Sequence, residues 1–231
     1  MAVAAGIMVP HPPLIVPDVG RGQEILIKDT IKAYQEAAGM AAELKPDTLV
    51  VISPHAVMYA DYFHVSPGKE ARGDFGRFMA PQIGVEAGYD EAFVRELDRL
   101  CGDDDFPMGT EGEREKELDH GTLVPLYFIN QHYRDYKLVR IGGSGLSFAD
   151  HYRAGRYIAR AAENLGRSVF IVASGDLSHK LRGDGPYGYS VQGPEYDERI
   201  MDVMGKGAFG ELLTFPEDFC EKAGECGHRS F

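Results

Sequence analysis

The sequence contains no tryptophan and only three cysteines among its 231 residues. Cys101, Cys220 and Cys226 form neither a CxxC pair nor a zinc-ribbon spacing, and a sparse, odd set argues against the disulfide framework of a secreted protein. Without tryptophan, the core must consist of aliphatic residues, phenylalanine and tyrosine. We therefore expect a reducing, cytoplasmic location, with Cys101 and Cys220 as buried thiols.

Basic residues and long apolar runs are also scarce. The chain has 24 Lys and Arg against 36 Asp and Glu, which gives a formal net charge of -12. Such an acidic surface repels a phosphate backbone, so nucleic acid is not an expected partner. No apolar run approaches the roughly 20 residues that cross a bilayer, and no basic region precedes the apolar N-terminus, so we expect neither a membrane span nor a signal peptide.

Short apolar runs alternate with amphipathic stretches along the chain. Apolar runs predict buried strands at 2–9, 47–53, 137–142 and 168–174. Helical spacing predicts helices over 21–45, 89–101 and 148–165, with two or three more between about 195 and 224. The remaining stretches are interpreted as loops, with short strands within 59–88, a charged loop at 102–118 and a flexible Gly/Pro-rich loop at 182–194.

This alternation predicts an α/β fold, a three-layer sandwich with a central mixed, largely parallel sheet flanked by helices. No shift in composition marks a linker, so we expect a single domain over residues 1–231. The chain stops at Phe231 directly after a distinctive motif, and we expect it to be truncated there.

Three histidines each sit just past the carboxyl end of a predicted strand: His11, His55 and His179. In open α/β sheets ligands bind outside that edge, so neighbouring parallel strands would bring the three imidazoles to one crevice. One such histidine is more often an ordinary loop residue, but three at equivalent positions favour a functional site. The loops around the first two are stiffened by Pro10, Pro12, Pro13 and Pro54. Such rigidity suits a preorganised metal site.

A metal ion bound by two imidazoles needs at least one further protein ligand. Two histidines and one carboxylate form the facial arrangement of non-haem Fe(II) oxygenases, which leaves coordination positions open. The pattern of residues alone does not select the carboxylate, and the candidates are Asp18, Asp61, Asp119, Asp176 and Glu225.

Five ordered strings are more specific: PHPPLIVPDVG, SPHAVMYADYF, DHGTLVPLYF, SGDLSHKL and ECGHRSF. They resemble, in this order, the motifs of the LigB-type class III extradiol ring-cleavage dioxygenases, and the similarity spans essentially the whole chain. The sequence is most similar to the branch known as the AmmeMemoRadiSam system protein A, or Memo-like branch.

The resemblance implies a role for each matching residue. His11 and His55 would be the imidazole ligands of a metal ion, and Glu225 its carboxylate ligand. His179 would be the acid/base histidine, and His120 would hydrogen-bond the substrate. The resemblance further implies Fe(II), a small catechol-like aromatic substrate, O₂ as co-substrate, and a homodimer.

Cys226 opens alternatives because it stands beside Glu225. In the related Memo proteins a cysteine lies at the metal site, so the ligand here is Glu225, Cys226, or each in a different state. A thiolate ligand favours zinc or copper over Fe(II) for ring cleavage. The Memo-like branch also accompanies a radical-SAM partner, which suggests a redox or modification-system protein without ring cleavage. A zinc-dependent hydrolase with His179 as acid/base is a third hypothesis.

The other histidines carry no motif. His64, His132 and His151 are interpreted as surface or packing residues, and His228 as a core or loop residue despite its position near Glu225. Asp119 and Asp176 either orient their neighbouring histidines or only begin turns.

Overall fold

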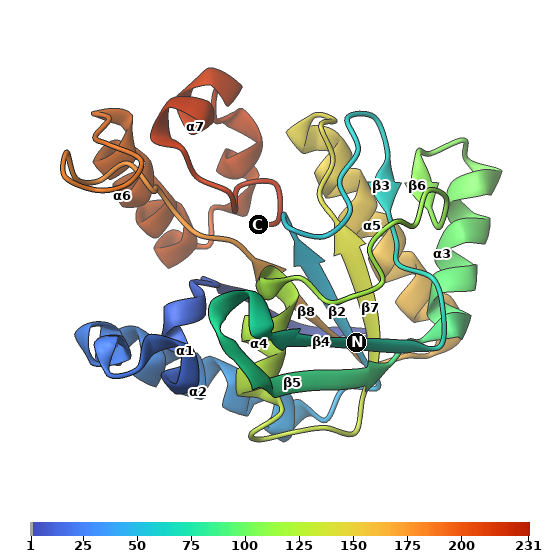
Figure 1. Cartoon of the computed structure of the whole chain (residues 1–231). Helices are drawn as coiled ribbons and strands as arrows, with labels where there is room; N and C mark the ends of the chain where they lie inside the picture. Colours follow the sequence, from blue (N-terminus) through green and yellow to red (C-terminus); the bar gives the residue numbers. More distant parts are fainter. Residues whose placement is uncertain (1) are drawn as a thin grey trace.

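The computed structural model describes residues 2–231, and at its centre is a four-stranded sheet (Figure 1). In spatial order, its strands are β1 (Val3–Val9), β8 (Val169–Ser174), β2 (Thr48–Ser53) and β7 (Lys137–Gly142). All three neighbouring pairs are parallel, so the four carboxyl ends lie at one edge. The predicted α/β fold with a largely parallel sheet is confirmed.

The apolar run of β2 is buried on both faces because each face is covered by helices. Leu49 and Val51 point into one hydrophobic cluster, which includes residues of α2 (Lys28–Leu44) and α4 (His120–Ile129). Val50 points into the opposite cluster, formed with α3 (Glu91–Asp103) and α5 (Phe148–Leu165). Successive side chains of a strand alternate between faces, so one short run fills two cores.

Two smaller sheets accompany the central one. β4 (Glu70–Phe75) and β5 (Ala80–Gly88) form an antiparallel hairpin, joined through a one-turn 3-10 helix, η3 (Gly76–Phe78). The second pairs β3 (Phe63–His64) with β6 (Met108–Gly109) in parallel. The hairpin crosses in front of the sheet in Figure 1 and packs against α4, which places its connecting turn near the start of that helix.

The helix predicted over 21–45 is wrong at its beginning. The chain forms η1 (Pro13–Ile15), α1 (Pro17–Gly20) and η2 (Gln23–Ile27) before α2 starts. Arg21 and Gly22 have φ values of 50° and 98°, in the left-handed region, which a continuous helix cannot contain. Ile25, within the predicted range, lies in η2 and is 68% exposed.

Helix α4 was not predicted from the sequence. Its residues are apolar and buried around nearly the whole circumference, so no amphipathic period marks it. Pro125 inside the helix also resembles a helix breaker. Proline has no N–H, so the carbonyl of Gly121, four residues earlier, receives no hydrogen bond from the helix backbone.

The C-terminal third contains α6 (Gln192–Lys206), η4 (Phe209–Thr214) and α7 (Glu217–Ala223), in agreement with the two or three helices expected there. They share a third hydrophobic cluster. Figure 1 shows this subassembly at the end of the molecule toward which the arrowheads of β2 and β7 point. In the described part of the chain, no helix combines the length and apolar character needed to cross a membrane.

Candidate metal centre

The candidate centre lies where β1, β8 and β2 end side by side. His11, Asp176 and His55 each stand two residues past the last residue of their strands, Val9, Ser174 and Ser53. Nε2 of His11 lies 3.0 Å from Nε2 of His55 and 3.8 Å from a carboxylate oxygen of Asp176. The three strands are therefore neighbours, as expected. After β8, the position that corresponds to His11 and His55 is occupied by Asp176, and His179 lies further along the loop.

Hydrogen bonds fix which nitrogen of His11 faces the site. The Ser174 hydroxyl donates to the carbonyl of Gly121 at 2.5 Å, the carbonyl that Pro125 leaves without a helix donor. With its proton committed there, the same hydroxyl accepts from Nδ1 of His11 at 2.9 Å. Nδ1 therefore carries the proton and Nε2 keeps its lone pair, as a metal-binding imidazole requires.

Gly121 is necessary for this close approach. A Cβ at Gly121 would collide with the Ser53 hydroxyl and would lie 3.4 Å from Nδ1 of His11. The start of α4 can thus reach the ends of β1 and β2 only without a side chain at this position.

Cys226 completes a group of three donor atoms. Its Sγ lies 3.6 Å from Nε2 of His11, and the ligand atoms of His11, His55 and Cys226 all lie within 4.8 Å of one another. Two nitrogens about 2.0–2.1 Å from one cation and about 90° apart at it are separated by roughly 3 Å. The nitrogen separation and the soft sulfur donor therefore fit one transition-metal ion.

Glu225, the carboxylate that the resemblance assigned to the metal, points elsewhere in this conformation. Its Oε2 accepts the backbone N–H of His228 at 2.6 Å. It belongs to neither of the two metal-ligand groups among residues 2–231, which are His11–His55–Cys226 and Asp176–His179–Cys226. Burial raises the pKa of the Glu225 carboxyl group.

His120 begins α4 and lies against the other two imidazoles. Its ring stacks on His55 with centroids 4.1 Å apart, and its centroid lies 5.3 Å from that of His11. Asp119 caps the helix by accepting the N–H of Thr122 at 3.0 Å and accepts the Ser53 hydroxyl at 2.5 Å. Asp119 thereby ties the start of α4 to the end of β2.

The segment that leads to Asp119 is held by a buried arginine. Arg140, on β7, is 1% exposed. Its guanidinium donates to the carbonyls of Glu115 and Glu117 at 2.6 and 2.7 Å and to the Ser66 hydroxyl at 2.7 Å. The planar fork of donors fixes the wall beside His120.

His179 forms a dyad with Asp176. Its Nδ1 donates to the carbonyl of Gly224 at 2.7 Å, while Nε2 lies 3.5 Å from Asp176 Oδ2. Because acceptors face both nitrogens, the doubly protonated form is favoured, and the hydrogen bond with Asp176 raises the pKa of His179. Burial alone would raise the pKa of Asp176, but its bonds with His179 and the His11 backbone N–H hold it below the usual value.

The pKa values of the three imidazoles at the candidate metal centre are lowered, whereas that of His179 is raised. Burial lowers the pKa of His11 from 6.5 to about 4, and burial also lowers the pKa of His55 and of His120. All three are neutral near pH 7, which leaves lone pairs for a cation. Burial raises the pKa of the Cys226 thiol to about 12, so a thiolate there needs a cation to stabilise it.

A family comparison agrees with this architecture. The model described as "Catalytic LigB subunit of aromatic ring-opening dioxygenase" matches residues 5–231. The chain belongs to the LigB family. The resemblance read from the five motifs is confirmed at family level.

Several proteins are similar to this LigB-family chain. "Protein CA_C1420" of Clostridium acetobutylicum is 37% identical over 230 residues, 96% of this chain and 49% of the relative. The chain thus spans about half the length of that protein. The 3,4-dihydroxyphenylacetate 2,3-dioxygenase of Escherichia coli is 26% identical over 205 residues, covering 82% of this chain and 74% of the enzyme.

The 2-aminophenol 1,6-dioxygenase beta subunit of a Pseudomonas species is 24% identical, with 96% of this chain and 80% of that subunit aligned. A solved structure of an uncharacterised Escherichia coli K12 protein aligns with a TM-score of 0.43 at 18% identity, over 73% of this chain and 64% of the other.

The other residues considered from the sequence lie outside the donor group of this LigB-family protein. Asp18 accepts from Gln82 at 3.3 Å, and Asp61 is exposed. His228 is 4% exposed and bonds Tyr196 and the Leu212 carbonyl, as expected of a core residue. Cys101 and Cys220 are buried, in agreement with the sequence-based prediction. His64 is fully buried, His151 bonds the Ser147 carbonyl, and His132 bonds Gln35 at the surface.

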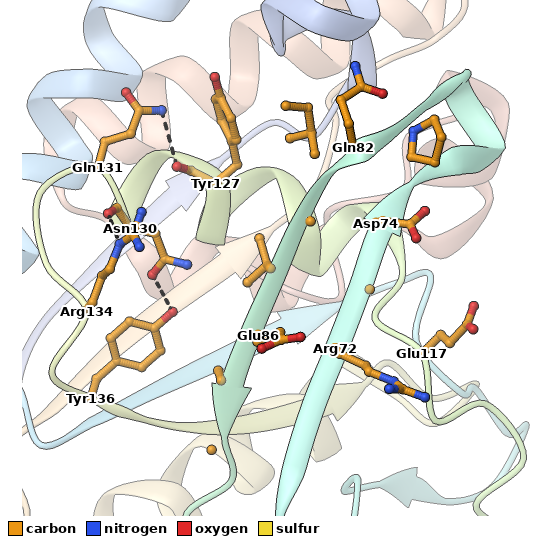
Figure 2. A pocket seen from close by; sticks show the side chains of 17 residues that line it. Arg72, Asp74, Gln82, Glu86, Glu117, Tyr127, Asn130, Gln131, Arg134 and Tyr136 are labelled. Atoms are coloured by element: carbon orange, nitrogen blue, oxygen red, sulfur yellow. Dashed lines mark hydrogen bonds between the residues drawn. The ribbon is translucent and has the colours of Figure 1, made fainter.

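Two concave surfaces flank the hairpin. A groove of about 1050 Å³ runs along β5 and the end of α4, where Tyr136 donates to Asn130 and Arg134 to the Asn130 carbonyl (Figure 2). A second cavity, of about 490 Å³, is lined by His55 and His120 together with η3 and the segment before α4. The second cavity therefore adjoins the candidate metal centre.

Proposed function

We propose that this LigB-family protein is a non-haem Fe(II)-dependent dioxygenase that opens the ring of a small catechol-like compound with O₂. The observation that carries the proposal is the pair of Nε2 atoms of His11 and His55, 3.0 Å apart, beside the His179–Asp176 dyad. The family match and the names of the two dioxygenase relatives support the same reaction class.

A bound Fe(II) would act as a Lewis acid and template that holds diol and O₂ together. The chain's own residues handle the protons. Nε2 of His179, protonated beside Asp176 and close to Cys226, can give a proton to a substrate oxygen at the metal and take one back as the reaction proceeds. His120 is neutral and lines the cavity, so its imidazole can hydrogen-bond a substrate hydroxyl.

We propose that the third metal ligand comes from Glu225–Cys226. Cys226 can ligate as it stands, with Sγ 3.6 Å from Nε2 of His11. Glu225 would first have to release the His228 backbone N–H, which costs about one charge-assisted hydrogen bond. Measuring the metal affinity of Cys226→Ser and of Glu225→Gln compares the two candidate ligands. The larger loss of affinity identifies the ligand, and His55→Ala serves as the variant that binds no metal.

A second function is favoured by the position of Cys226. A thiolate beside two imidazoles suits zinc or copper, or a redox role, better than ring cleavage by Fe(II). The protein would then be a Memo-like metal-binding redox or modification-system protein without dioxygenase activity, acting with a radical-SAM partner.

Oxygen uptake separates the two functions. The protein is purified without O₂, loaded with Fe(II), and supplied with a panel of diols that includes 3,4-dihydroxyphenylacetate and with 2-aminophenol. Uptake that disappears in His179→Ala, with metal content unchanged, supports ring cleavage. Full Fe(II) loading with no uptake on any compound rejects it and leaves the redox alternative. Preferential zinc or copper binding that is lost in Cys226→Ser supports that alternative.

A further inference from the structure

The two groups of metal-ligating side chains in the described part of the chain have one member in common. His11, His55 and Cys226 form the first group, and Asp176, His179 and Cys226 form the second. In each group the ligand atoms all lie within 4.8 Å of one another. The second group is the His179–Asp176 dyad with a sulfur beside it. Nitrogen, oxygen and sulfur donors of this kind are those that hold zinc in proteins.

The carboxylate of Asp176 is oriented toward both groups. Its Oδ1 accepts the backbone N–H of His11 at 2.8 Å, which fixes the position of the side chain. Its Oδ2 lies 3.5 Å from Nε2 of His179 and 3.8 Å from Nε2 of His11. One oxygen is thus held by the backbone, and the other is directed at imidazole nitrogens.

The separation between Asp176 Oδ2 and His179 Nε2 suits two ligands of one cation. At 3.5 Å it is long for an N–H···O hydrogen bond, which usually measures about 2.7–3.2 Å. Two ligand atoms at about 2.0–2.2 Å from a tetrahedral cation are separated by roughly 3.3–3.6 Å. The dyad is therefore spaced for a cation as well as for a proton.

The backbone orients His179 in the way typical of a metal ligand. Its Nδ1 donates to the carbonyl of Gly224 at 2.7 Å, so Nε2 is the nitrogen that faces Asp176. Metal-bound histidines usually donate their other N–H to a carbonyl or carboxylate in this way. The side chains of His179 and Asp176 are 29% and 22% exposed, so a cation and a water molecule can reach them.

The sulfur of Cys226 lies between the two groups. It accepts the backbone N–H of Asp176 at 3.3 Å and lies 3.6 Å from Nε2 of His11. A nitrogen and a sulfur bound to one tetrahedral zinc ion, at about 2.0–2.1 and 2.3 Å, are separated by roughly 3.5 Å. A thiolate has more than one lone pair, so it can bind a cation on the His11 side and another on the His179 side.

We propose that Asp176, His179 and Cys226 form a second cation site, with zinc as its occupant and the Cys226 sulfur shared between two metal ions. The inference rests on the proposed function, because the first ion is the one held by His11 and His55. A cation on Nε2 of His179 takes the place of the proton that the proposed ring opening uses. Zinc in excess would therefore stop that proton transfer.

Zinc stoichiometry tests the second site without any turnover. The wild-type protein, freed of metal and dialysed against excess zinc, should hold two zinc ions per chain. His179→Ala should hold one, and the ion that it keeps shows that the variant is folded. Asp176→Asn should do the same. His132→Gln is the control, because His132 is an exposed histidine that bonds Gln35 at the surface, and this variant should keep both ions.

Cadmium in place of zinc reports whether the sulfur is shared. Two cadmium nuclei bound to one thiolate couple through it, so NMR of the wild-type protein should show two resonances split by mutual coupling. His179→Ala should leave a single unsplit resonance.

Each result supports or overturns the inference. One zinc ion in the wild-type protein, or two in His179→Ala, overturns the second site and leaves the proposed function intact. Two uncoupled cadmium resonances overturn the sharing of Cys226. Loss of an ion in His132→Gln assigns that ion to the surface and also overturns the second site. A wild-type protein that binds no zinc, cadmium or Fe(II) overturns the metal centre of the proposed function and the inference with it.

Discussion

Ser174 and His11 are joined by a hydrogen bond of 2.9 Å that determines which imidazole nitrogen is free for a metal. The Ser174 hydroxyl can accept from Nδ1 because its own proton is donated to the Gly121 carbonyl. When a histidine binds a metal through one nitrogen, a hydrogen bond on its other nitrogen orients the ring and fixes the tautomer. Loss of that hydrogen bond lowers metal affinity by roughly 10- to 100-fold.

Ser174→Ala should therefore weaken metal binding by about tenfold or more without abolishing it, since the ligand atoms remain. Affinity is measured by competition with a chelator. Ser144→Ala is the control, because this serine is equally buried and its hydroxyl accepts the Leu146 N–H away from the ligands. Equal affinity in the two variants would contradict the proposed orientation of His11.

Asp176→Asn should lower the pKa of His179 toward its ordinary value, because the carboxylate that stabilises the imidazolium is replaced by a neutral amide. Imidazole shifts in an NMR titration report this directly. Any activity that needs protonated His179 falls as pH rises through that pKa, so its basic limb should move to lower pH. Asp202→Asn is the control, because Asp202 pairs with Lys206 at the surface instead. An unmoved pKa in Asp176→Asn would exclude the dyad.

The metal-free protein should lose stability as pH falls from about 7 to 5. Folding lowers the pKa of His11 from 6.5 to about 4. Between these two pH values His11 is protonated in the unfolded chain but neutral in the folded chain, so a fall in pH stabilises the unfolded state. His11 alone then contributes a loss of roughly 2 kcal/mol over this range. The raised pKa of His179 acts in the opposite direction, since its stabilising effect is present at low pH and is lost as pH rises.

Urea unfolding at both pH values measures this dependence. His11→Asn cannot titrate at this position, so its free energy of unfolding should change less with pH than that of the wild-type protein. The same slope in both proteins would show that other groups cause the acid destabilisation.

Arg140→Met should destabilise the fold by about 3–5 kcal/mol, because two carbonyls and a hydroxyl lose a buried charged donor. The midpoint of urea unfolding measures the change. Arg153→Met, at a side chain that is 54% exposed, should change stability by no more than about 1 kcal/mol. Similar values for both variants would mean that the fork of Arg140 is not what holds residues 113–119.

The sequence predicted the sheet and the convergence of His11 and His55 because both follow from strand order and parallel pairing. It left the third donor open between Glu225 and Cys226. Glu225 and Cys226 are adjacent in a turn and point in different directions, which only the turn geometry determines. The five motifs located Asp119 and His120, but helix α4 itself lacked the amphipathic period by which a sequence indicates a helix.

Pro125 has a consequence beyond helix α4. Any other residue at this position would bring a backbone N–H as a second donor to the Gly121 carbonyl, which would weaken the hydrogen bond from Ser174. A more regular helix would thus hold the serine hydroxyl less firmly and would weaken its hold on the orientation of His11. Positions 125 and 174 are far apart in sequence and one of them is buried in an apolar helix, yet they should be retained or lost together as this protein diverges.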